Sequence, residues 1–279
     1  MALIITLTTD FGLADSYVAA MKGVILGINP EASLIDISHS IQPRNILQAA
    51  FLLSTVHEFF PQGTIHLAVV DPGVGTERRA VILRTPSADF IAPDNGVLSC
   101  IIQQHSTGRG NSTPGQRELA PGLEAVALTR DKFWRSPVSP TFHGRDIMAP
   151  VAAHLSLGRP LTDFGETATS LSVLPMPRPF QSSDGALVGQ VLHIDNFGNL
   201  VTDIRADDLP RTDRHLIIEV GGKAISGLSD TYGKGEGLLA LIGSSGYLEV
   251  AVRDGSASAS LHVDVGDRVQ IRLKPMDSG

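Results

Sequence analysis

The chain has a single cysteine, Cys100, which excludes an internal disulfide framework and any zinc site built from several cysteines. Basic residues are outnumbered, 22 against 29 acidic ones, and the net charge of −7 argues against nucleic acid as a partner. Long apolar runs are scarce too, since the run that ends at Asp10 is too short to span a membrane. We therefore expect a cytoplasmic protein without a membrane segment.

The N-terminal part of the chain contains an alternation of strand-like and helix-like segments. Strand patterns and helical patterns follow each other in the order 3–9, 16–28, 33–38, 46–60 and 64–70. This alternation predicts an α/β fold over residues 1–172, with a mainly parallel sheet flanked by helices. Residues 106–118 are polar and rich in glycine, serine and threonine, which predicts a surface loop.

A proline-rich stretch separates this part from the rest of the chain. Residues 173–186 hold three prolines at alternate positions, which disfavour a helix and predict an extended linker. Beyond it, short strand-like runs are separated by glycine, aspartate and serine turns. This pattern predicts a second domain over residues 187–279, a small antiparallel β-barrel.

The most informative motif is VVDPGVGTERRAV, residues 69–81, in which a hydrophobic strand leads into an acidic residue, a glycine-rich turn and two arginines. Loops at strand ends carry much of the chemistry of open α/β sheets. The turn can fold back so that Asp71 and Arg78 face one cavity, which favours a polarised water or a bound polar ligand. Taken alone, the motif fits equally well a turn-stabilising aspartate followed by a surface arginine.

Two further motifs carry candidate residues. In TTDFGLADSY, Asp10 ends the first strand, where a carboxylate suits hydrogen bonds to a ribose diol; helix capping is the alternative, and it explains Asp15 well. In TFHGRD, His143 precedes an apparent helix, whose positive end disfavours an imidazolium and should keep the ring neutral. A neutral histidine can exchange hydrogen bonds with water, as base catalysis requires, or it can be a packed or capping residue.

The second domain has polar loops in IDNFGNLVT, DTYGKGEG and IGSSGYLEVAVRDG. Asp195, Asn199 and the paired serines at strand ends could bind a polar zwitterion, and Tyr232 could stack on a flat base. Ordinary turn chemistry explains each of these residues taken singly, because such residues stabilise hairpins without any ligand.

Together these motifs resemble the S-adenosyl-L-methionine (SAM) hydrolases that form adenosine, also called SAM hydroxide adenosyltransferases, which are relatives of fluorinating and chlorinating enzymes. The resemblance runs from TTDFG through VDPGVGTERR, APDNG and TFHGRD to IDNFGN and SSGYLEVAVRDG. It implies hydrolysis of SAM to adenosine and L-methionine by in-line attack of water or hydroxide on ribose C5′, without a cofactor or metal. It also implies a homotrimer, whose active site lies between the N-terminal domain of one subunit and the C-terminal barrel of the next.

The resemblance assigns roles to individual residues. The catalytic set falls on Asp71, Arg78 and His143, although Arg79 adjoins Arg78 and leaves a one-residue ambiguity. The substrate-binding positions are the ribose acid Asp10, the methionine-binding Asp195, Asn199 and Ser244, the adenine-stacking Tyr232, and the adenine-edge residues Arg253, Asp254 and Gly255. At position 254 many relatives carry asparagine instead.

The resemblance also favours hydrolysis over halogenation. Where the halogenating relatives line a compact halide pocket with hydroxyl and aromatic side chains, this chain carries Asp71, His143 and Gly144. A buried carboxylate repels a halide anion, but it accepts a hydrogen bond from water.

The residues leave two other functions open. Asp10, Asp15, Asp71 and Asp94 could form the oxygen-rich cation site of a metal-dependent nucleosidase or phosphohydrolase. Against this alternative, Arg78 would place a positive charge beside the cation. The other alternative is a non-catalytic SAM- or adenosine-binding protein, which would bind its ligand without turnover.

Overall fold

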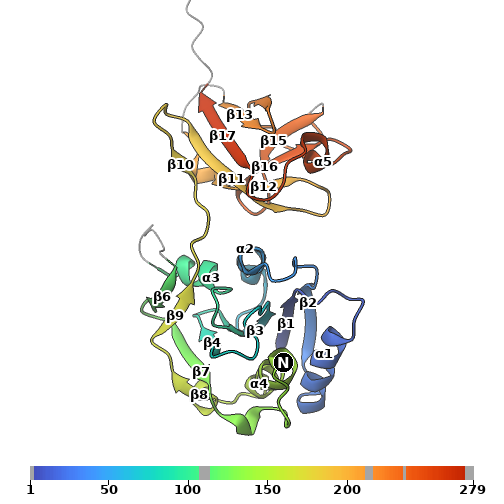
Figure 1. Cartoon of the computed structure of the whole chain (residues 1–279), viewed down its shortest axis with the longest axis vertical. Coiled ribbons are helices and arrows are strands. Elements are labelled where there is room, and N and C mark those ends of the chain that lie inside the picture. Colours follow the sequence, from blue (N-terminus) through green and yellow to red (C-terminus); the bar gives the residue numbers. More distant parts are fainter. Residues whose placement is uncertain (1–2, 107–113, 211–215, 235–236, 274–279) are drawn as a thin grey trace, which may run out of the picture. The chain divides into compact units, whose positions relative to one another are not determined.

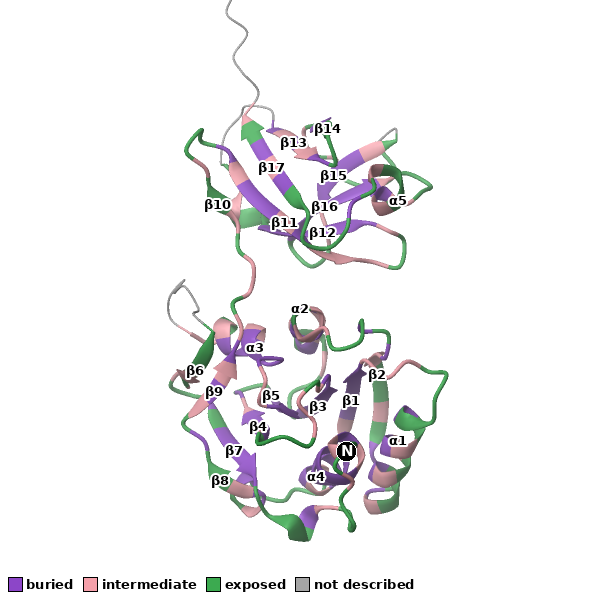
Figure 2. Cartoon of the chain, in the orientation of Figure 1, coloured by how far each residue is buried: buried purple, intermediate pink, exposed green. Residues whose placement is uncertain are grey.

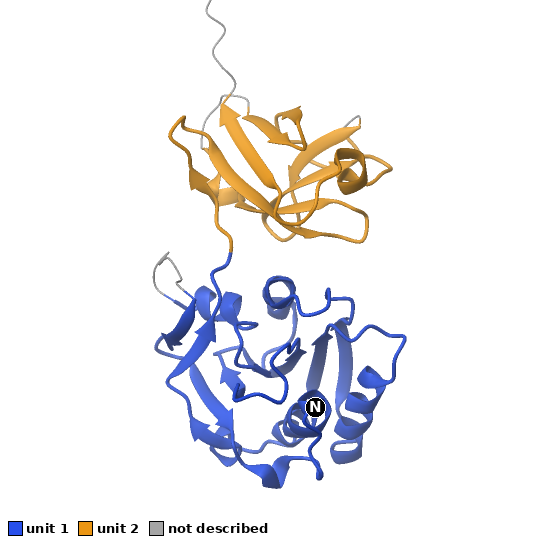
Figure 3. Ribbon diagram, in the orientation of Figure 1, with its two compact units in different colours: residues 1–176 blue, residues 177–279 orange. Residues whose placement is uncertain are grey.

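The computed structural model describes residues 3–106, 114–210, 216–234 and 237–273. The chain divides into two compact units, residues 1–176 (unit 1) and residues 177–279 (unit 2), which Figure 3 shows in two colours. In the described part of the chain, no helix is both long and apolar enough to cross a membrane.

Unit 1 is built on a seven-stranded sheet in the order β2-β1-β3-β5-β4-β7-β8 (Figure 1). The strands are β1 Ile4–Thr9, β2 Ser33–Ser38, β3 Thr64–Val69, β4 Ala80–Arg84, β5 Ala88–Pro93, β7 Glu124–Leu128 and β8 Gly165–Thr167. From β2 to β5 neighbouring strands pair parallel, whereas from β5 to β8 they pair antiparallel. The predicted α/β fold is confirmed, and its sheet is a mixed one.

Helices cover both faces of this sheet. The helices are α1 Tyr17–Ile28, α2 Ile46–Val56, α3 Ser99–Gln104 and α4 Ala149–Ser156, with short helical turns at η1 His57–Phe59, η2 Asp131–Phe133, η3 Gly144–Met148 and η4 Leu161–Asp163. Successive residues of a strand point to opposite faces. Leu67 and Val69 of β3 therefore join one buried cluster with α1 and α4, while Ala68 joins a second cluster with α2 and α3.

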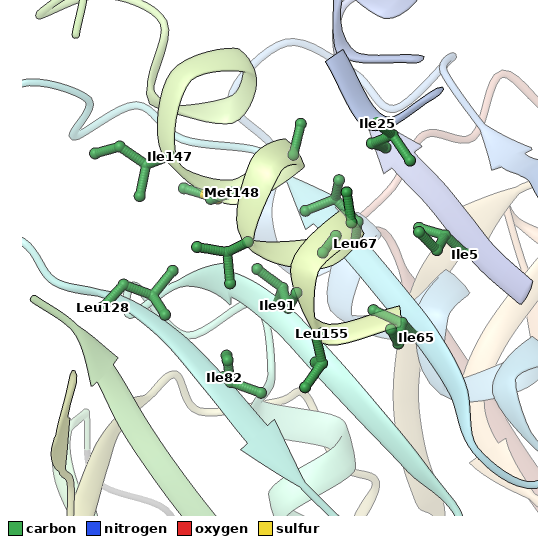
Figure 4. Packing of buried hydrophobic residues seen from close by; sticks show 14 of the residues in the cluster. Ile5, Ile25, Ile65, Leu67, Ile82, Ile91, Leu128, Ile147, Met148 and Leu155 are labelled. Carbon is green, nitrogen blue, oxygen red and sulfur yellow. The ribbon is translucent and has the colours of Figure 1, made fainter. Parts of the chain in front are cut away.

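The core of unit 1 is dense and aliphatic. Figure 4 shows Met148 and Leu155, at the end of η3 and in α4, lying over Leu67, Ile82 and other side chains of the sheet. Figure 2 shows the buried residues concentrated along the central strands. This packing fixes the ends of β1 and β3, from which the candidate site is built.

One sequence-based expectation is wrong in part. The surface loop predicted over 106–118 contains strand β6, Gly115–Glu118, which pairs antiparallel with β9, Ser170–Val173. Polar cross-strand contacts support the pair, since Gln116 Nε2 donates to Ser172 Oγ at 2.8 Å. The partner strand lies more than fifty residues away, so local composition gave no sign of it. Residues 107–113 of the predicted loop lie outside the described residues.

Unit 2 is an antiparallel sheet in the order β14-β13-β17-β11-β12-β16-β15, with β10 paired to β11. The elements are β10 Phe180–Gln181, β11 Leu187–Ile194, β12 Leu200–Arg205, η5 Ala206–Asp208, β13 Leu216–Val220, β14 Lys223–Ser226, β15 Leu238–Ile242, β16 Tyr247–Val252, α5 Ala257–Leu261 and β17 Arg268–Leu273. The sheet curves into a nearly closed barrel around a core that includes Val191, Ile218 and Val250. The predicted antiparallel barrel is confirmed.

Candidate functional site

Two aspartates stand at the same edge of the unit 1 sheet. Strands β1 and β3 pair parallel with Thr9 opposite Val69, so the two strands end side by side. Asp10 directly follows β1, and Asp71 comes two residues after β3. Both line a cavity of about 280 Å³. The carboxyl ends of parallel strands are the usual place for a binding crevice in an open α/β sheet.

Several side chains with distinct chemistry line this cavity. They include Asp10, Asp71, His143, Phe11, Tyr17 and Phe142. A second cavity of about 330 Å³ lies against β7 and β8, and among its described lining residues Glu124 is the only ionisable one. The first cavity is therefore the candidate functional site, because of these two cavities it is the one where acid and base groups of the described residues converge.

Asp71 and Arg78 form a bidentate ion pair. Arg78 Nε donates to Asp71 Oδ1 at 2.8 Å, and Arg78 Nη2 donates to Oδ2. Both side chains are largely withdrawn from solvent, at 5% exposure for Asp71 and 10% for Arg78. The glycine-rich turn returns the chain, as expected, but the described lining of the cavity includes Asp71 and not Arg78. Arg78 therefore binds the Asp71 carboxylate without lining the cavity itself.

His143 completes a cluster of three side chains. Arg78 Nη2 lies 3.1 Å from His143 Nδ1, within hydrogen-bond distance. A guanidinium can only donate, so Nδ1 must accept and carries no proton. When the ring is neutral, its proton therefore sits on Nε2. The structure thus brings the three predicted catalytic residues into direct contact and fixes the tautomer of the histidine.

The electrostatic surroundings of His143 favour its neutral form. Burial and then the positive charge of Arg78 lower the pKa of His143 below 6.5, and they outweigh Asp71 and Asp146, which act to raise it. The sequence predicted a neutral ring from its place before a helix, whereas burial and Arg78 are the causes that favour the neutral form in the structure.

The segment that carries His143 is anchored by Asp146. His143 caps η3, a single turn of π-helix, a rare form that often occurs at functional sites. The carboxylate of Asp146 is fully buried, and it accepts hydrogen bonds from the Ser139 backbone N–H at 2.9 Å and from Arg145 Nε at 2.7 Å. This bonding ties the loop before His143 to the turn after it, and so holds the imidazole in place.

Arg79 turns away from the cluster, although it adjoins Arg78. Its Nε lies 3.1 Å from Asp94 Oδ2, and its Nη2 donates to the Ser170 carbonyl at 3.0 Å. The other oxygen of Asp94 accepts from the Ser172 backbone N–H at 2.6 Å. Of the two arginines, Arg78 is therefore the one that contacts Asp71 and His143.

This pairing also bears on the alternative cation site. Of its four proposed ligands, Asp10 and Asp71 line the cavity, whereas Asp94 is paired with Arg79 and Asp15 is exposed. Asp71 itself is paired with Arg78. Within the described ranges, no three His, Cys, Asp or Glu side chains form a group that could hold a metal ion.

Two glycines let the surrounding segments approach each other closely. Gly75 has a φ of +79°, and a Cβ there would lie 2.4 Å from the Pro140 carbonyl oxygen. A Cβ on Gly144 would lie 3.0 Å from the side chain of Val69. The first contact joins the turn between Asp71 and Arg78 to the loop before His143, and the second seats His143 against the end of β3.

Asp10 is held by a backbone group from the next loop. The Arg44 N–H donates to Asp10 Oδ2 at 2.8 Å, and Arg44 has a φ of 67°, unusual for a residue with a side chain. One carboxylate oxygen is fixed in this way, and Asp10 also lines the cavity. The helix-capping reading of Asp10 has no support in the contacts of α1, which has no side-chain cap.

An aromatic cluster forms part of the cavity wall. Phe11, Tyr17 and Phe142 contact one another, with ring centroids 5.3 to 5.7 Å apart, and the Arg145 guanidinium lies 4.8 Å from the Phe142 ring centroid. Sequence reasoning missed these residues. The available signal was their place inside the two motifs that supplied Asp10 and His143.

In unit 2, Asp195 organises its own loop. Its Oδ1 accepts from the backbone N–H groups of Phe197 and Asn199, at 2.8 and 2.9 Å, and its Oδ2 accepts from Asn199 Nδ2 at 2.8 Å. This is the turn chemistry weighed as the alternative for these residues. The structure brings the two predicted methionine-binding residues together, and Oδ2 of the carboxylate can still accept one more hydrogen bond.

Tyr232 is fixed by an acid that sequence reasoning missed. Its hydroxyl donates to Glu249 Oε2 at 2.6 Å, and Glu249 is only 7% exposed. Burial, then Glu249 and Asp195, raise the pKa of Tyr232, which also shows that Asp195 lies nearby. Gly243 leaves room for this acid, because a Cβ there would lie 1.8 Å from Glu249 Oε1. Glu249 stands inside the motif SSGYLEVAVRDG, but its place within strand β16 gave no sign of a role in the site.

The remaining predicted residues lie in turns of unit 2. Ser244 is exposed in the turn between β15 and β16. Arg253, Asp254 and Gly255 form the turn after β16, in which Asp254 has a φ of 56°. Asparagine and aspartate tolerate this left-handed conformation better than most residues, which gives a physical reason for either at position 254.

Comparisons with known proteins agree on one family. The chain matches the model of the SAM hydroxide adenosyltransferase N-terminal domain over residues 5–165 and that of the C-terminal domain over residues 189–270. It is 37% identical to a Salinispora tropica protein named (R)-S-adenosyl-L-methionine hydrolase, over 96% of this chain and 97% of that protein. A Thermus thermophilus protein of the same name is 35% identical, over 94% of this chain and 97% of its own length.

More distant and structural relatives extend this picture. A protein from an Actinoplanes species named fluorinase is 30% identical, over 75% of this chain and 74% of its own length. The crystal structure of an uncharacterised conserved protein from Thermotoga maritima superposes with a TM-score of 0.84 at 37% identity, over 96% of this chain and 99% of that one.

Proposed function

The chain belongs to the SAM hydroxide adenosyltransferase family, and on that basis we propose that it hydrolyses SAM to adenosine and L-methionine. The observation that carries this proposal is the direct contact among Asp71, Arg78 and His143 beside a cavity of about 280 Å³. These groups suit the binding and activation of water, whereas a carboxylate at this place opposes a halide.

The reaction starts with attack of the water oxygen on ribose C5′, in line with the C5′–S bond. The C5′–O bond forms as the C5′–S bond breaks, and the electron pair of the broken bond goes to sulfur. Methionine then departs as a neutral thioether, which needs no proton. The new oxygen substituent carries one proton too many, and that proton passes to a base of the protein.

Asp71 is the group best placed to receive this proton. Nδ1 of His143 is already used by Arg78, and a proton on Nε2 prevents that nitrogen from accepting another. An alkyl-substituted water is strongly acidic, so a carboxylate such as that of Asp71 is a sufficient base for it. Positioned proton transfer of this kind contributes about 10²–10⁴-fold, and alignment and exclusion of water supply the rest.

The aromatic cluster supports a cationic substrate. Aromatic ring faces attract cations such as quaternary ammonium groups, and a sulfonium carries the same single charge. We assign Phe11, Tyr17 and Phe142 to this role and Asp10 to the ribose diol. In unit 2, we assign Asp195, Asn199 and Ser244 to the methionine part of SAM.

We assign the adenine to the second group of unit 2 residues. Tyr232 would stack on the ring, while Arg253, Asp254 and Gly255 would bind its edge. We also propose a homotrimer whose sites combine the two units from neighbouring subunits, which light scattering of the purified protein would test. The cytoplasmic location stays a proposal that rests on the scarcity of cysteine.

Product analysis tests the function directly. Purified protein incubated with SAM in ¹⁸O-labelled water should release methionine and adenosine with the label on O5′. Release of free adenine would instead indicate a nucleosidase, and 5′-chloroadenosine formed in the presence of chloride would indicate halogenation. SAM recovered unchanged after long incubation would indicate a binding protein.

A chelator tests the proposal that no metal takes part. A sulfonium leaving group does not need a Lewis acid to stabilise it, so we expect the rate of adenosine formation to be unchanged by the chelator. A loss of rate that added Mg²⁺ or Ca²⁺ restores would favour the metal-dependent alternative.

Variants then test the assigned residues. Asp71→Asn keeps the size and a hydrogen-bonding oxygen but removes the base, so kcat should fall about 10²-fold or more while SAM still binds. His143→Ala should also lower kcat strongly. Full rates in both variants would show that the cluster is not the catalytic site.

A further inference from the structure

The Asp10 loop of unit 1 is held by a buried histidine that takes no part in the proposed chemistry. His39 lies just after β2 and is 4% exposed. Its Nδ1 is 2.9 Å from Thr9 Oγ1, and its backbone carbonyl accepts a hydrogen bond from the Gly12 N–H at 2.8 Å. His39 therefore forms hydrogen bonds with the residues on both sides of Asp10 and Phe11, which line the cavity.

The hydroxyl of Thr9 connects His39 to the backbone of the Asp10 loop. Thr9 is fully buried, and its Oγ1 also accepts from the Phe11 backbone N–H at 3.3 Å. The same oxygen thus faces the imidazole on one side and the loop backbone on the other. Loss of either contact would free the loop to rotate Asp10, whose only other fixed point in the described contacts is the Arg44 N–H.

An acid and a lysine fix the orientation of the His39 ring. Nε2 lies 3.0 Å from Asp36 Oδ1, an ion-pair distance, although the angle departs from that of a good hydrogen bond. Lys22 Nζ lies 2.6 Å from the other oxygen of Asp36. Partial burial acts to raise the pKa of Asp36, but Lys22 and His39 together lower it, so the carboxylate stays charged at neutral pH. A carboxylate there favours a proton on Nε2, and in that tautomer Nδ1 accepts from the Thr9 hydroxyl.

We propose that His39 is a positioning residue, supported by Asp36, that holds Asp10 in the orientation needed to bind the ribose diol of the substrate. The order Asp36, His39, Thr9 has the geometry of an acid–histidine–hydroxyl triad, but Thr9 has no exposed surface and so cannot act as a nucleophile. This inference rests on the proposed function, because it takes Asp10 to be the ribose-binding acid.

The test compares two nucleosides that differ only in the diol. Adenosine and 2′,3′-dideoxyadenosine are titrated calorimetrically into the full-length protein and into its variants. His39→Leu should weaken adenosine binding about tenfold, the size expected for a hydrogen bond to a charged group, and leave dideoxyadenosine binding unchanged. His39→Asn can still present a polar atom near the position of Nδ1 and should restore most of the affinity for adenosine. With SAM as substrate, KM should rise in His39→Leu much more than kcat falls.

Control variants separate positioning from stability. His57→Leu removes another buried histidine of unit 1 and should leave the ratio of the two affinities at the wild-type value. Should His39→Leu fail to fold, Asp36→Asn, at a partly exposed position, should lower the same ratio to a smaller extent. Equal weakening of both nucleosides in the His39 or Asp36 variants, or no change in either, would overturn the proposal.

Asp10→Asn distinguishes this failure from failure of the proposed function. If that substitution does not reduce the preference for adenosine over dideoxyadenosine, Asp10 is not the ribose-binding acid, and the proposed function loses that assignment. If it does reduce the preference and the His39 variants do not, only the positioning role is wrong.

Discussion

Arg78 contacts Nδ1 of His143 across 3.1 Å, and this contact exists only while that nitrogen lacks a proton. Protonation of the ring would break the hydrogen bond and set two cations against each other. The same guanidinium binds Asp71. The state of His143 is thus coupled to the position of the acid that receives the proton in the proposed reaction.

The pH dependence of the rate follows from this coupling. Burial and Arg78 lower the pKa of His143 below 6.5, so the ring is neutral above that lowered value and becomes charged as the pH falls through it. We expect kcat/KM to decrease in acid solution, with its acid-side inflection below pH 6.5. A pH–rate profile with SAM measures this, and an acid-side inflection above 6.5 would contradict it.

Substitution of the two neighbouring arginines should separate catalysis from stability. Arg78→Met removes both bonds to Asp71 and the bond to His143, so kcat should fall about 10²-fold or more. Arg79→Met removes bonds to Asp94 and to the Ser170 carbonyl, which lie outside the cavity, so the melting temperature should fall while kcat is nearly kept. Steady-state kinetics and thermal unfolding of both variants measure these effects. Equal losses of kcat in the two variants would refute the assignment of Arg78 to the catalytic cluster.

The stability of unit 1 should decrease in mild acid because of His66. This ring is fully buried and stacked on Phe90, and burial, then the nearby His57, lower the pKa of His66 to about 4. In the unfolded chain the ring binds a proton near pH 6.5, so the stabilising contribution is present above 6.5 and is lost as the pH falls toward 4. Between pH 7 and pH 5 the free energy of unfolding should drop by about 2 kcal/mol from this residue.

Urea unfolding at the two pH values measures this effect. The single tryptophan, Trp134, lies in unit 1, so its fluorescence reports on that unit. His66→Phe should flatten the pH dependence, and an unchanged slope in that variant would show that other groups are responsible.

Asp203 of unit 2 should have the opposite pH dependence. Burial raises the pKa of this carboxyl from 3.8 to about 6, and its main hydrogen-bond donor is the Gln190 backbone N–H at 2.8 Å. Its stabilising contribution is therefore present below pH 3.8 and lost as the pH rises through 6. At pH 8 Asp203→Asn, which can still accept from Gln190, should stabilise unit 2 by up to about 3 kcal/mol.

Hydrogen exchange of unit 2 amides at pH 8 measures the change in Asp203→Asn. The gain should shrink to below about 1 kcal/mol at pH 4, where the wild-type carboxyl is already protonated in the folded state. Asp207→Asn, at an exposed position nearby, serves as the control and should have little effect at either pH. A destabilised Asp203→Asn variant at pH 8 would contradict the prediction.

Much of the fold was predictable because two patterns of apolar residues are strong in this chain: the runs typical of strands and the spacing typical of helices. The alternation of strand and helix patterns in unit 1 and the short strand runs of unit 2 both appear in the structure. The pairing of β6 with β9 was not predictable, because a short polar strand depends on a distant partner rather than on its own composition. The antiparallel pairing from β5 to β8 was not predictable either, because it too depends on which strands become neighbours.

The candidate site was partly predictable for a similar reason. Asp71 and His143 stand inside motifs, at a strand end and before a helical turn, and the structure brings them together through Arg78. The choice between Arg78 and Arg79 could not be made, because neighbouring residues of an extended segment point to opposite sides and either register was possible. Glu249 was missed because its role depends on Tyr232, seventeen residues earlier in the chain.

The contact of Gly75 with the Pro140 carbonyl has a consequence for ligand entry. Two loops from distant parts of the chain lie in direct backbone contact there without an intervening side chain, so we expect them to move together. An incoming molecule therefore meets a rigid wall whose polar atoms are already aimed, and little binding energy is spent on assembling it. Flexibility for admission and release has to come from elsewhere along the rim.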